Sequence, residues 1–362
     1  MVGWALLADS VPLYPLYALL FVDTGLSDAR ISVLFAIWGT VGLLAEVPSG
    51  ALADRFSRRG ALVVAGLVQA AAFAVWVTLP GFAGFAAGFV LWGLGGALVS
   101  GAQEALLYDG LAAVGAEAHY AQVQGRVTAM GLLAQVPAAV AATALYAVGG
   151  YPLVGWASVG VLLGASALAA RLPEPERSPG DGSYLATLTA GVREVAARPR
   201  LRAAVLAAAA VGGFDAVDEY FPILAQDSGV PVELVPAAML VIAVAGAAGA
   251  AAGGAASRLP PWALGVVLGV SLVLFGLVTY APVFGAVSYA LYRAVLVVVD
   301  ARLQERIDST ARATVTSVAG VGVETAGLAL FGVWAFGGPT ATVAVWLLAA
   351  LALPWWLRRR VS

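Results

Sequence analysis

The chain has 362 residues, of which 61% are hydrophobic and 11% charged, and its net charge at pH 7 is -2. A soluble domain is about 45–50% apolar and about 25% charged, so this composition excludes a single water-soluble core and indicates a protein that faces lipid. The sequence has no cysteine, no lysine and one histidine, which excludes a phosphate-loop lysine, a Schiff-base lysine and a thiolate metal site. The charge shows no bias toward nucleic acid, and we expect no cofactor and no metal.

The apolar residues occur in long stretches that are separated by Gly, Pro and charged residues. A membrane span needs about 20 predominantly apolar residues, and twelve stretches meet this need. Their continuous apolar character predicts helices rather than the alternating strands of a barrel. We therefore predict an all-α polytopic membrane protein with twelve transmembrane helices. In order, these spans 1 to 12 are residues 3–22, 30–51, 60–79, 83–107, 122–147, 151–171, 201–224, 232–255, 261–280, 283–301, 312–335 and 339–357.

The longest polar stretch, residues 172–200, divides these spans into two sets of six. It is rich in Pro and Gly and continues, from residue 183 to 197, as a segment with mixed polar and apolar faces. This pattern predicts a cytoplasmic linker with an amphipathic interfacial helix. The predicted domains are thus an N-terminal six-helix bundle at 1–171, the linker, and a C-terminal six-helix bundle at 201–362.

The two halves also resemble each other in sequence. Residues 23–27 (DTGLS) after span 1 correspond to residues 227–231 (DSGVP) after span 7, and residues 50–55 after span 2 correspond to residues 253–258 after span 8. The spacing between the two matches is similar in each half. We interpret them as an internal repeat, which is typical of transporters that bind their substrate near the bilayer midplane.

Arginine positions predict the orientation of the chain. Basic residues near span ends favour the cytoplasmic side. With the spans above, the loop arginines fall on one side except for Arg30, and Arg293 lies inside a span. Both termini are then cytoplasmic, and Trp355 and Trp356 lie at the interface beside the last arginines. We expect a multi-pass protein of the plasma (cytoplasmic) membrane of a prokaryote.

The loop between spans 2 and 3 carries a specific pattern. A glycine is followed by Ala-Asp-Arg and then by a pair of arginines. This pattern resembles the signature loop of the major facilitator superfamily. The resemblance implies two pseudo-symmetric six-helix bundles, transport, and a cytoplasmic gate that bridges the two halves in the outward-open state. A plain positively charged loop is the alternative, although it does not require the glycine and the aspartate. The gate motif comprises Glu46, Gly50, Asp54, Arg55, Arg58 and Arg59.

Charged residues within the spans are the first candidates for a site. A charge inside a bilayer costs about 2.5–3.5 kcal/mol on insertion scales, so it needs a partner, water or a function. At a rise of 1.5 Å per residue, Asp9 in span 1 and Asp215 in span 7 lie near the midplane, in equivalent places of the two repeats. Asp218 and Glu219 are expected to share a helical face with Asp215 and to lie closer to the outside.

Two carboxylates and one arginine complete this set. Arg293 in span 10 and Glu324 in span 11 also fall near mid-depth. We predict that Asp9, Asp215 and Glu324 bind a proton or a cationic solute, with Arg293 as the counter-charge or as a ligand for an anion. Burial raises the pKa of a carboxyl group in general and a nearby arginine lowers it. The alternative is a permanent ion pair of Arg293 with Glu324 or with Asp215 that fixes helix packing.

Aromatic residues at similar depth are further candidates. They can stack on an aromatic or cationic solute, or they can be ordinary packing residues. Pro12 and Pro15 are expected to loosen span 1. The aromatic candidates are Tyr17, Trp38, Trp92 and Tyr289, with Tyr14 and Tyr292 beside them.

Together these features predict a secondary active transporter that moves a small organic solute by alternating access. We expect proton coupling, export ahead of uptake, and a monomer in a lipid bilayer. An uncoupled facilitator and a non-transporting sensor or scaffold are the alternatives, although a sensor should carry an added soluble domain and the loops are short. An enzyme is not expected, since no nucleophile with a base and no set of metal ligands occurs at membrane depth.

Overall fold

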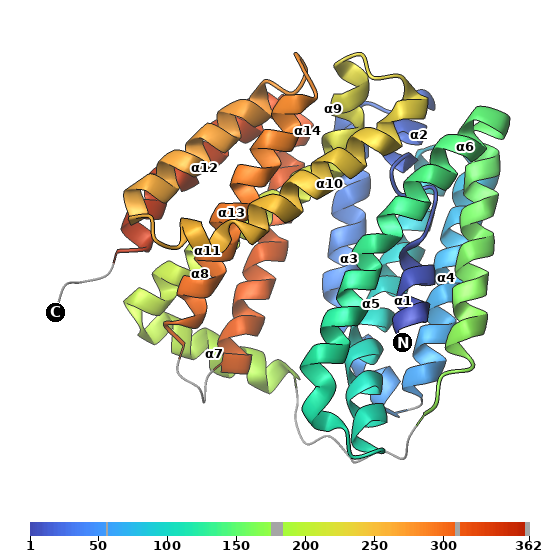
Figure 1. The fold of residues 1–362 in the computed structure, drawn as a ribbon, viewed down its shortest axis with the longest axis horizontal. Coiled ribbons are helices and arrows are strands. Elements are labelled where there is room, and N and C mark those ends of the chain that lie inside the picture. Colours follow the sequence, from blue (N-terminus) through green and yellow to red (C-terminus); the bar gives the residue numbers. More distant parts are fainter. Residues whose placement is uncertain (56, 175–183, 308–311, 359–362) are drawn as a thin grey trace. The chain divides into compact units, whose positions relative to one another are not determined.

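A computed structural model describes residues 1–55, 57–174, 184–307 and 312–358. Over these ranges the chain is helical and contains no strand (Figure 1). Three short 3-10 helices, η1 (Glu117–His119), η2 (Gly213–Tyr220) and η3 (Val232–Leu234), connect the longer ones. The α-helices are α1 (Val2–Asp9), α2 (Tyr17–Asp23), α3 (Asp28–Arg55), α4 (Arg58–Thr78), α5 (Phe82–Ala112), α6 (Tyr120–Ala169), α7 (Tyr184–Ala197), α8 (Pro199–Gly212), α9 (Phe221–Asp227), α10 (Val235–Ala251), α11 (Gly253–Ala256), α12 (Pro261–Gly276), α13 (Val283–Gln304) and α14 (Arg312–Trp356).

The helices form two compact units. The first unit comprises Met1–Asp181 with Val232–Ala237, and the second comprises Gly182–Pro231 with Ala238–Ser362. In the first unit α5 packs against α3 and α4, while α6 packs against α1 and α4. In the second unit α13 and α14 each pack against α8 and α12. The helix α7 covers most of the segment for which the sequence predicts an interfacial helix, and it packs on α8 and α14.

Two of the long helices, α6 and α14, are each two spans joined at a glycine. Gly150 and Gly338 both have a φ of 58°, a conformation that side chains with a Cβ rarely adopt. Pro152 and Pro339 follow within two residues. The glycine redirects the chain, and the proline is tolerated because the first turn of a helix leaves its N–H groups unpaired. The same device thus occurs between the last two spans of each half.

The spans can now be counted. Seven segments of the described chain are long and apolar enough to cross a membrane. Two of the seven, Glu117–Ala169 and Thr314–Trp356, are divided at the glycines and hold two spans each. The shorter apolar helix α12 and two interrupted segments, α1–α2 and α8–α9, complete the twelve spans.

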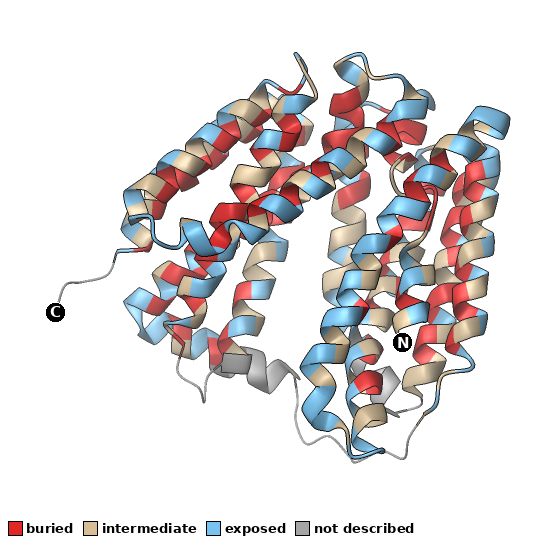
Figure 2. Ribbon diagram, viewed as in Figure 1, coloured by how far each residue is buried: buried red, intermediate tan, exposed pale blue. Residues whose placement is uncertain are grey.

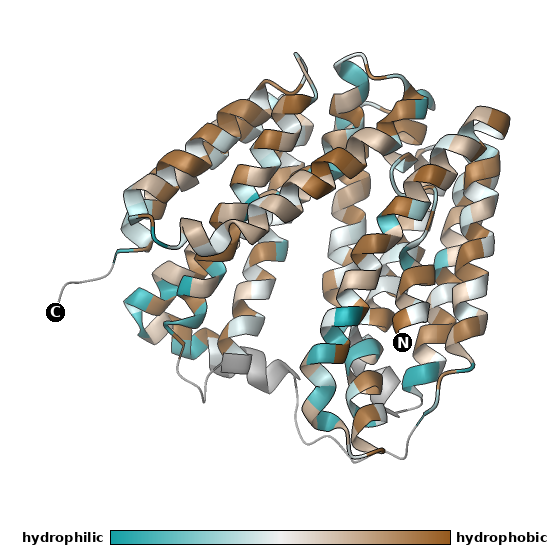
Figure 3. Cartoon of the chain, viewed as in Figure 1, coloured by the Kyte–Doolittle hydropathy of each residue, from teal (hydrophilic) through white to brown (hydrophobic). Residues whose placement is uncertain are grey.

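The exposed positions of these spans include many large apolar side chains. Val140 in α6 and Leu351 in α14 are 63% and 76% exposed, as expected of side chains that face lipid rather than water. Figure 2 shows such exposed positions along the helices, with buried residues between neighbouring helices. Figure 3 shows that hydrophobic residues run along the helices and that hydrophilic ones gather toward helix ends.

Glycines and serines hold neighbouring helices close together. A Cβ atom at Gly253 would lie 2.6 Å from Val297 of α13, so only glycine fits at this crossing. Ser271 on α12 and Ser288 on α13 each donate a hydrogen bond to the other's carbonyl oxygen at 2.8 Å. Interhelical hydrogen bonds of this kind contribute about 0.6 kcal/mol each in a membrane, and several of them together fix the helix register.

Candidate functional site

Span 1 is interrupted near its middle, and Asp9 lies at the interruption. The helix α1 ends at Asp9, and α2 begins at Tyr17. Pro12 and Pro15 lie between them, and a proline within a helix removes a hydrogen bond and clashes with the preceding turn. The continuous helix predicted for residues 3–22 is therefore replaced by two short ones.

The unwound segment is fastened to α6. The N–H of Leu13 donates to Ser158 Oγ at 3.0 Å, and both residues are fully buried. Ser158 Oγ in turn donates to the carbonyl oxygen of Val154 at 2.8 Å. In lipid every backbone polar group needs a partner within the protein. Ser158 supplies the acceptor that the missing helical turn would have provided.

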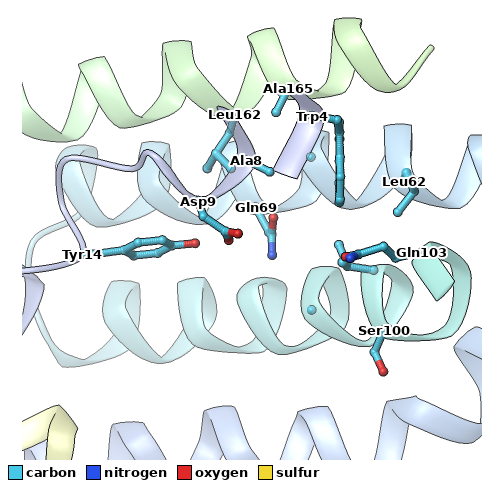
Figure 4. A pocket seen from close by; sticks show the side chains of 13 residues that line it. Trp4, Ala8, Asp9, Tyr14, Leu62, Gln69, Ser100, Gln103, Leu162 and Ala165 are labelled. Carbon is cyan, nitrogen blue, oxygen red and sulfur yellow. The ribbon is translucent and has the colours of Figure 1, made fainter. Parts of the chain in front are cut away.

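A cavity of about 220 Å³ lies beside Asp9 within the first unit (Figure 4). In Figure 4 the hydroxyl end of Tyr14 and the amide of Gln69 lie on either side of the Asp9 carboxylate. The backbone of α6 comes close at Gly131, where a Cβ atom would lie 2.6 Å from Asp9 Oδ2. The polar lining side chains come from α1, the unwound segment, α4 and α5, and they are Asp9, Tyr14, Gln69, Ser100 and Gln103.

Span 7 is interrupted as well, and Asp215 lies in the interruption. The sequence predicts one continuous α-helix over residues 201–224. Instead, the 3-10 helix η2 separates α8 from α9. Two carbonyl groups at the end of α8 accept side-chain hydrogen bonds. Trp346 Nε1 donates to Ala210 at 2.8 Å, and the Tyr292 hydroxyl donates to Gly212 at 3.4 Å.

The Asp215 carboxylate has two partners on α13. Arg293 Nη1 lies 3.3 Å from Oδ2, and the Tyr289 hydroxyl donates to Oδ1 at 3.0 Å. The guanidinium carbon of Arg293 also lies 5.8 Å from the centre of the Tyr289 ring, within the range of a cation–π interaction. Positions 289 and 293 are one helical turn apart, so both side chains reach Asp215 from one face. Of the two pairings that the sequence leaves open for Arg293, the structure contains the one with Asp215.

The other predicted carboxylates of the second unit lie on η2 and α14. Three residues complete a turn of a 3-10 helix, so Asp218 follows Asp215 along η2, whereas Glu219 is rotated away by about a third of a turn. The expectation that both share the face of Asp215 assumed an α-helix and is therefore wrong for Glu219. Glu324 lies on α14 with an exposed side chain. Within the described ranges, no group of three or more His, Cys, Asp or Glu side chains is placed to hold a metal ion.

Three of the predicted aromatic residues, Tyr17, Trp38 and Trp92, pack into one aromatic cluster of the first unit. The ring centres of Trp92 and Tyr14 lie 5.2 Å apart, so the cluster reaches the cavity through Tyr14. The fourth, Tyr289, contacts Asp215 in the second unit. The cluster comprises Tyr14, Tyr17, Phe21, Phe35, Trp38, Phe73, Trp76, Phe85, Phe89 and Trp92.

The arginine pair of the signature loop meets carboxylates of its own unit. Arg58 forms an ion pair with Asp109 of α5. Glu174 accepts hydrogen bonds from the Arg58 N–H at 2.9 Å and from Ser57 Oγ at 2.7 Å, and it lies 3.7 Å from Arg59 Nε. A carboxylate at this place also favours the N-terminus of α4, where the helix dipole is positive.

The rest of the gate motif is only partly described. Glu46 is exposed near the end of α3. The side chains of Asp54 and Arg55, and the surroundings of Gly50, lie outside what the structure describes. The gate that the resemblance implies therefore stays a prediction.

Three polar residues that lie at the cavity or at the arginine pair were not among the candidates predicted from the sequence. Gln69 and Gln103 line the cavity, and Glu174 meets the arginine pair. Charge within a span is the signal that indicates a site, and the two amides carry none, while Glu174 lies outside the predicted spans. Gln69 was nevertheless visible as the one amide in the apolar run of span 3.

Comparison with known proteins identifies relatives of this chain. Two uncharacterized MFS-type transporters, from two strains of Mycobacterium tuberculosis, are each 35% identical to it over 162 residues. This segment is 45% of this chain and 38% of each relative. The match therefore spans well under half the length of those relatives.

Solved structures of transporters share the fold. A bacterial homolog of the human lysosomal transporter Spinster, in an inward-facing and occupied conformation, has a TM-score of 0.76 at 16% identity and covers 98% of this chain and 94% of its own. The nucleoside transporter NupG has a TM-score of 0.72 at 13% identity, covering 98% and 96%. A D-xylose-proton symporter has a TM-score of 0.68 at 14% identity, covering 97% and 95%.

At identities this low the structures establish the fold alone, and they confirm the predicted all-α fold of twelve spans. The sequence model of the Major Facilitator Superfamily matches residues 2–343, which is most of the chain. The family predicted from the loop after span 2 is thus confirmed: this chain belongs to the major facilitator superfamily.

Proposed function

We propose that this chain is a secondary active transporter that moves a small organic solute by alternating access and couples this movement to protons. Membership of a transporter family supports transport rather than catalysis. One observation carries the coupling: a carboxylate, Asp215, lies in an interrupted span and is held by Arg293 and Tyr289. Interrupted helices near the midplane are typical of solute and ion sites in transporters.

The coupling follows from electrostatics. A proton on Asp215 removes the negative charge that Arg293 faces at 3.3 Å. An arginine without a counter-charge inside a span costs about 2.5–3.5 kcal/mol on insertion scales. The free energy of Arg293 is then lowered when its side chain moves to water or to another hydrogen-bond acceptor. The proton therefore binds more tightly to an arrangement of η2 and α13 in which Arg293 has left Asp215. A ligand can drive a conformational change only through such a difference in affinity between two states.

The other candidate residues are proposed as further proton or cation sites and as the cytoplasmic gate. Asp9 is proposed as a second proton or cation site, beside the cavity of the first unit, and Glu324 as a third. The segment Glu46–Arg59 is proposed as the cytoplasmic gate. We further propose a monomer in a prokaryotic plasma membrane, with both termini in the cytoplasm and export as the direction of transport.

Solute flux into proteoliposomes tests this function. A thermal-shift screen of small organic solutes on the purified protein first selects a ligand, and accumulation of that ligand is then measured with and without a pH gradient. We expect accumulation when the lumen is acidic, which is proton–solute exchange and corresponds to export. A protonophore should abolish it.

The other outcomes separate the alternatives. Accumulation driven by an acidic exterior would indicate symport and uptake. Flux that a gradient does not change would indicate an uncoupled facilitator. A ligand that stabilises the protein but is never transported would indicate a sensor or scaffold.

A further inference from the structure

We propose that the cavity beside Asp9 binds a small organic cation of about nine non-hydrogen atoms. This proposal rests on the proposed transport function and names the class of solute. It is carried by the size of the cavity, by its charge, and by the contrast with the matching site in the second unit.

The volume of the cavity sets the size of the solute. A protein cavity of about 150 Å³ accommodates benzene, which has six non-hydrogen atoms. The cavity beside Asp9 measures about 220 Å³. In proportion, it has room for a molecule of about nine non-hydrogen atoms.

The charge of the lining selects a cation. Asp9 is the one charged side chain among the residues that line the cavity. No other described residue forms an ion pair or hydrogen bond with its carboxylate. Asp9 is also the last residue of α1, where the helix dipole adds a partial negative charge. A carboxylate at membrane depth needs a compensating partner, and a cation in the cavity supplies one.

The uncharged lining fits an organic ammonium group. The rings of Trp4 and Tyr14 line the cavity, and such rings attract cations through their negative faces. The amide oxygens of Gln69 and Gln103 can accept hydrogen bonds from ammonium N–H groups. A metal ion is less suited, since it would not use the aromatic surface or fill the volume.

In the second unit, a carboxylate in an interrupted span is paired with a cation that belongs to the protein itself, the side chain of Arg293. Asp215 lies in the interruption of span 7 as Asp9 lies in that of span 1. There the guanidinium of Arg293 lies 3.3 Å from the carboxylate and 5.8 Å from the ring of Tyr289. In the first unit, the hydroxyl end of Tyr14 lies beside the Asp9 carboxylate, and no arginine is among the residues that line the cavity. The cation is therefore expected from outside the protein.

Isothermal titration of the purified full chain in detergent tests the proposal. The probe is 2-phenylethylamine, which has nine non-hydrogen atoms and is cationic at pH 7. The comparison is 2-phenylethanol, which has the same size and no charge, and both are also titrated into protein-free micelles. We expect the amine to bind at least about tenfold more tightly than the alcohol.

Two pairs of variants locate the binding. Asp9→Asn should remove the preference for the amine, whereas Asp28→Asn, which removes an exposed carboxylate of the same unit, should keep it. Gly96→Leu provides an independent test in case Asp9→Asn fails to fold. A Cβ atom at Gly96 meets nothing within 4 Å, and Gly96 lines the cavity, so the leucine is expected to occupy part of the cavity. Gly160→Leu on α6 is the matched control, because its Cβ also meets nothing and it does not line the cavity.

Three results would overturn the proposal: no binding of the amine to folded wild-type protein, equal binding of amine and alcohol, or unchanged amine binding in Gly96→Leu. The titration uses no gradient, so its failure leaves proton coupling untouched. Conversely, gradient-independent flux would contradict the proposed coupling and leave amine binding standing.

Discussion

A carboxylate in the middle of a membrane span is stable only if something offsets its charge, and this chain does so in two ways. Asp215 is compensated from within the protein by Arg293 and Tyr289. Asp9 faces a cavity whose lining contains no positive charge. Two residues at equivalent places in the repeat are therefore suited to different tasks: Asp215 to releasing a partner when it is protonated, and Asp9 to binding a cation from outside.

We expect Asp215→Asn to destabilise the protein and Arg293→Gln in the same chain to restore much of the loss. The single substitution leaves the charge of Arg293 in the span without its carboxylate. The cost is about 2.5–3.5 kcal/mol on insertion scales, and less here because the two side chains are 33% and 39% exposed. The double variant removes both charges, which is often close to neutral. Thermal unfolding in detergent measures both. A double variant as unstable as the single one would show that Arg293 has another role in packing.

Depth could be predicted from sequence for these residues, but their partners could not. A fixed rise per residue places Asp9 and Asp215 near the midplane. The contact between Asp215 and Arg293 spans 78 positions, and the sequence left Glu324 and Asp215 as equal candidates. Only the fold brings Arg293 of α13 within 3.3 Å of Asp215 in η2.

Both interrupted spans depend on side chains from neighbouring helices. Ser158 accepts from Leu13 in the first unit, and Trp346 and Tyr292 donate to carbonyl groups of α8 in the second. These bonds replace part of what a continuous helix would have made. Each interruption is thus a supported structure rather than a frayed end, and it holds a carboxylate at a defined place.

Ser158→Ala should destabilise the protein by about 1–3 kcal/mol, because it leaves the buried N–H of Leu13 without an acceptor. Ser10→Ala is the matched control. Its hydroxyl bonds the Leu6 carbonyl one turn back on an exposed surface, and little change is expected. Unfolding temperatures of the two variants in detergent check this prediction. Equal, small shifts would mean that Leu13 finds another partner when span 1 is unwound.

The sequence predicts most helices well and the interruptions unevenly. Continuous apolar runs give α3, α4, α5 and α13 to within a few residues of their observed bounds. Pro12 and Pro15 indicate a weakness in span 1, since proline cannot continue a helix. Span 7 has no proline inside η2, so its change to a 3-10 helix depends on tertiary packing that a local pattern does not contain.

At the scale of the whole molecule the two units repeat one plan. In each, the first span is interrupted and carries a carboxylate, and the last two spans are joined at a glycine with positive φ that is followed by a proline. The short sequence matches between the halves predict this repeat, and the family fold agrees with it.

The predicted orientation can be tested with a single introduced cysteine, because the chain has none of its own. Ser27 precedes α3 and Glu117 precedes α6, and both are exposed. In intact cells a membrane-impermeant maleimide should label Ser27→Cys, whereas Glu117→Cys should be labelled only after permeabilisation. The opposite pattern would place both termini outside.

Proton coupling through Asp215 is tested most directly by the double variant Asp215→Asn/Arg293→Gln in proteoliposomes. This variant keeps the span free of unpaired charge and lacks the carboxylate that would take up the proton. With an acidic lumen, we expect the wild type to accumulate its solute and the folded double variant to equilibrate it without accumulation. Accumulation of the solute by the double variant to the wild-type level would contradict the role of Asp215.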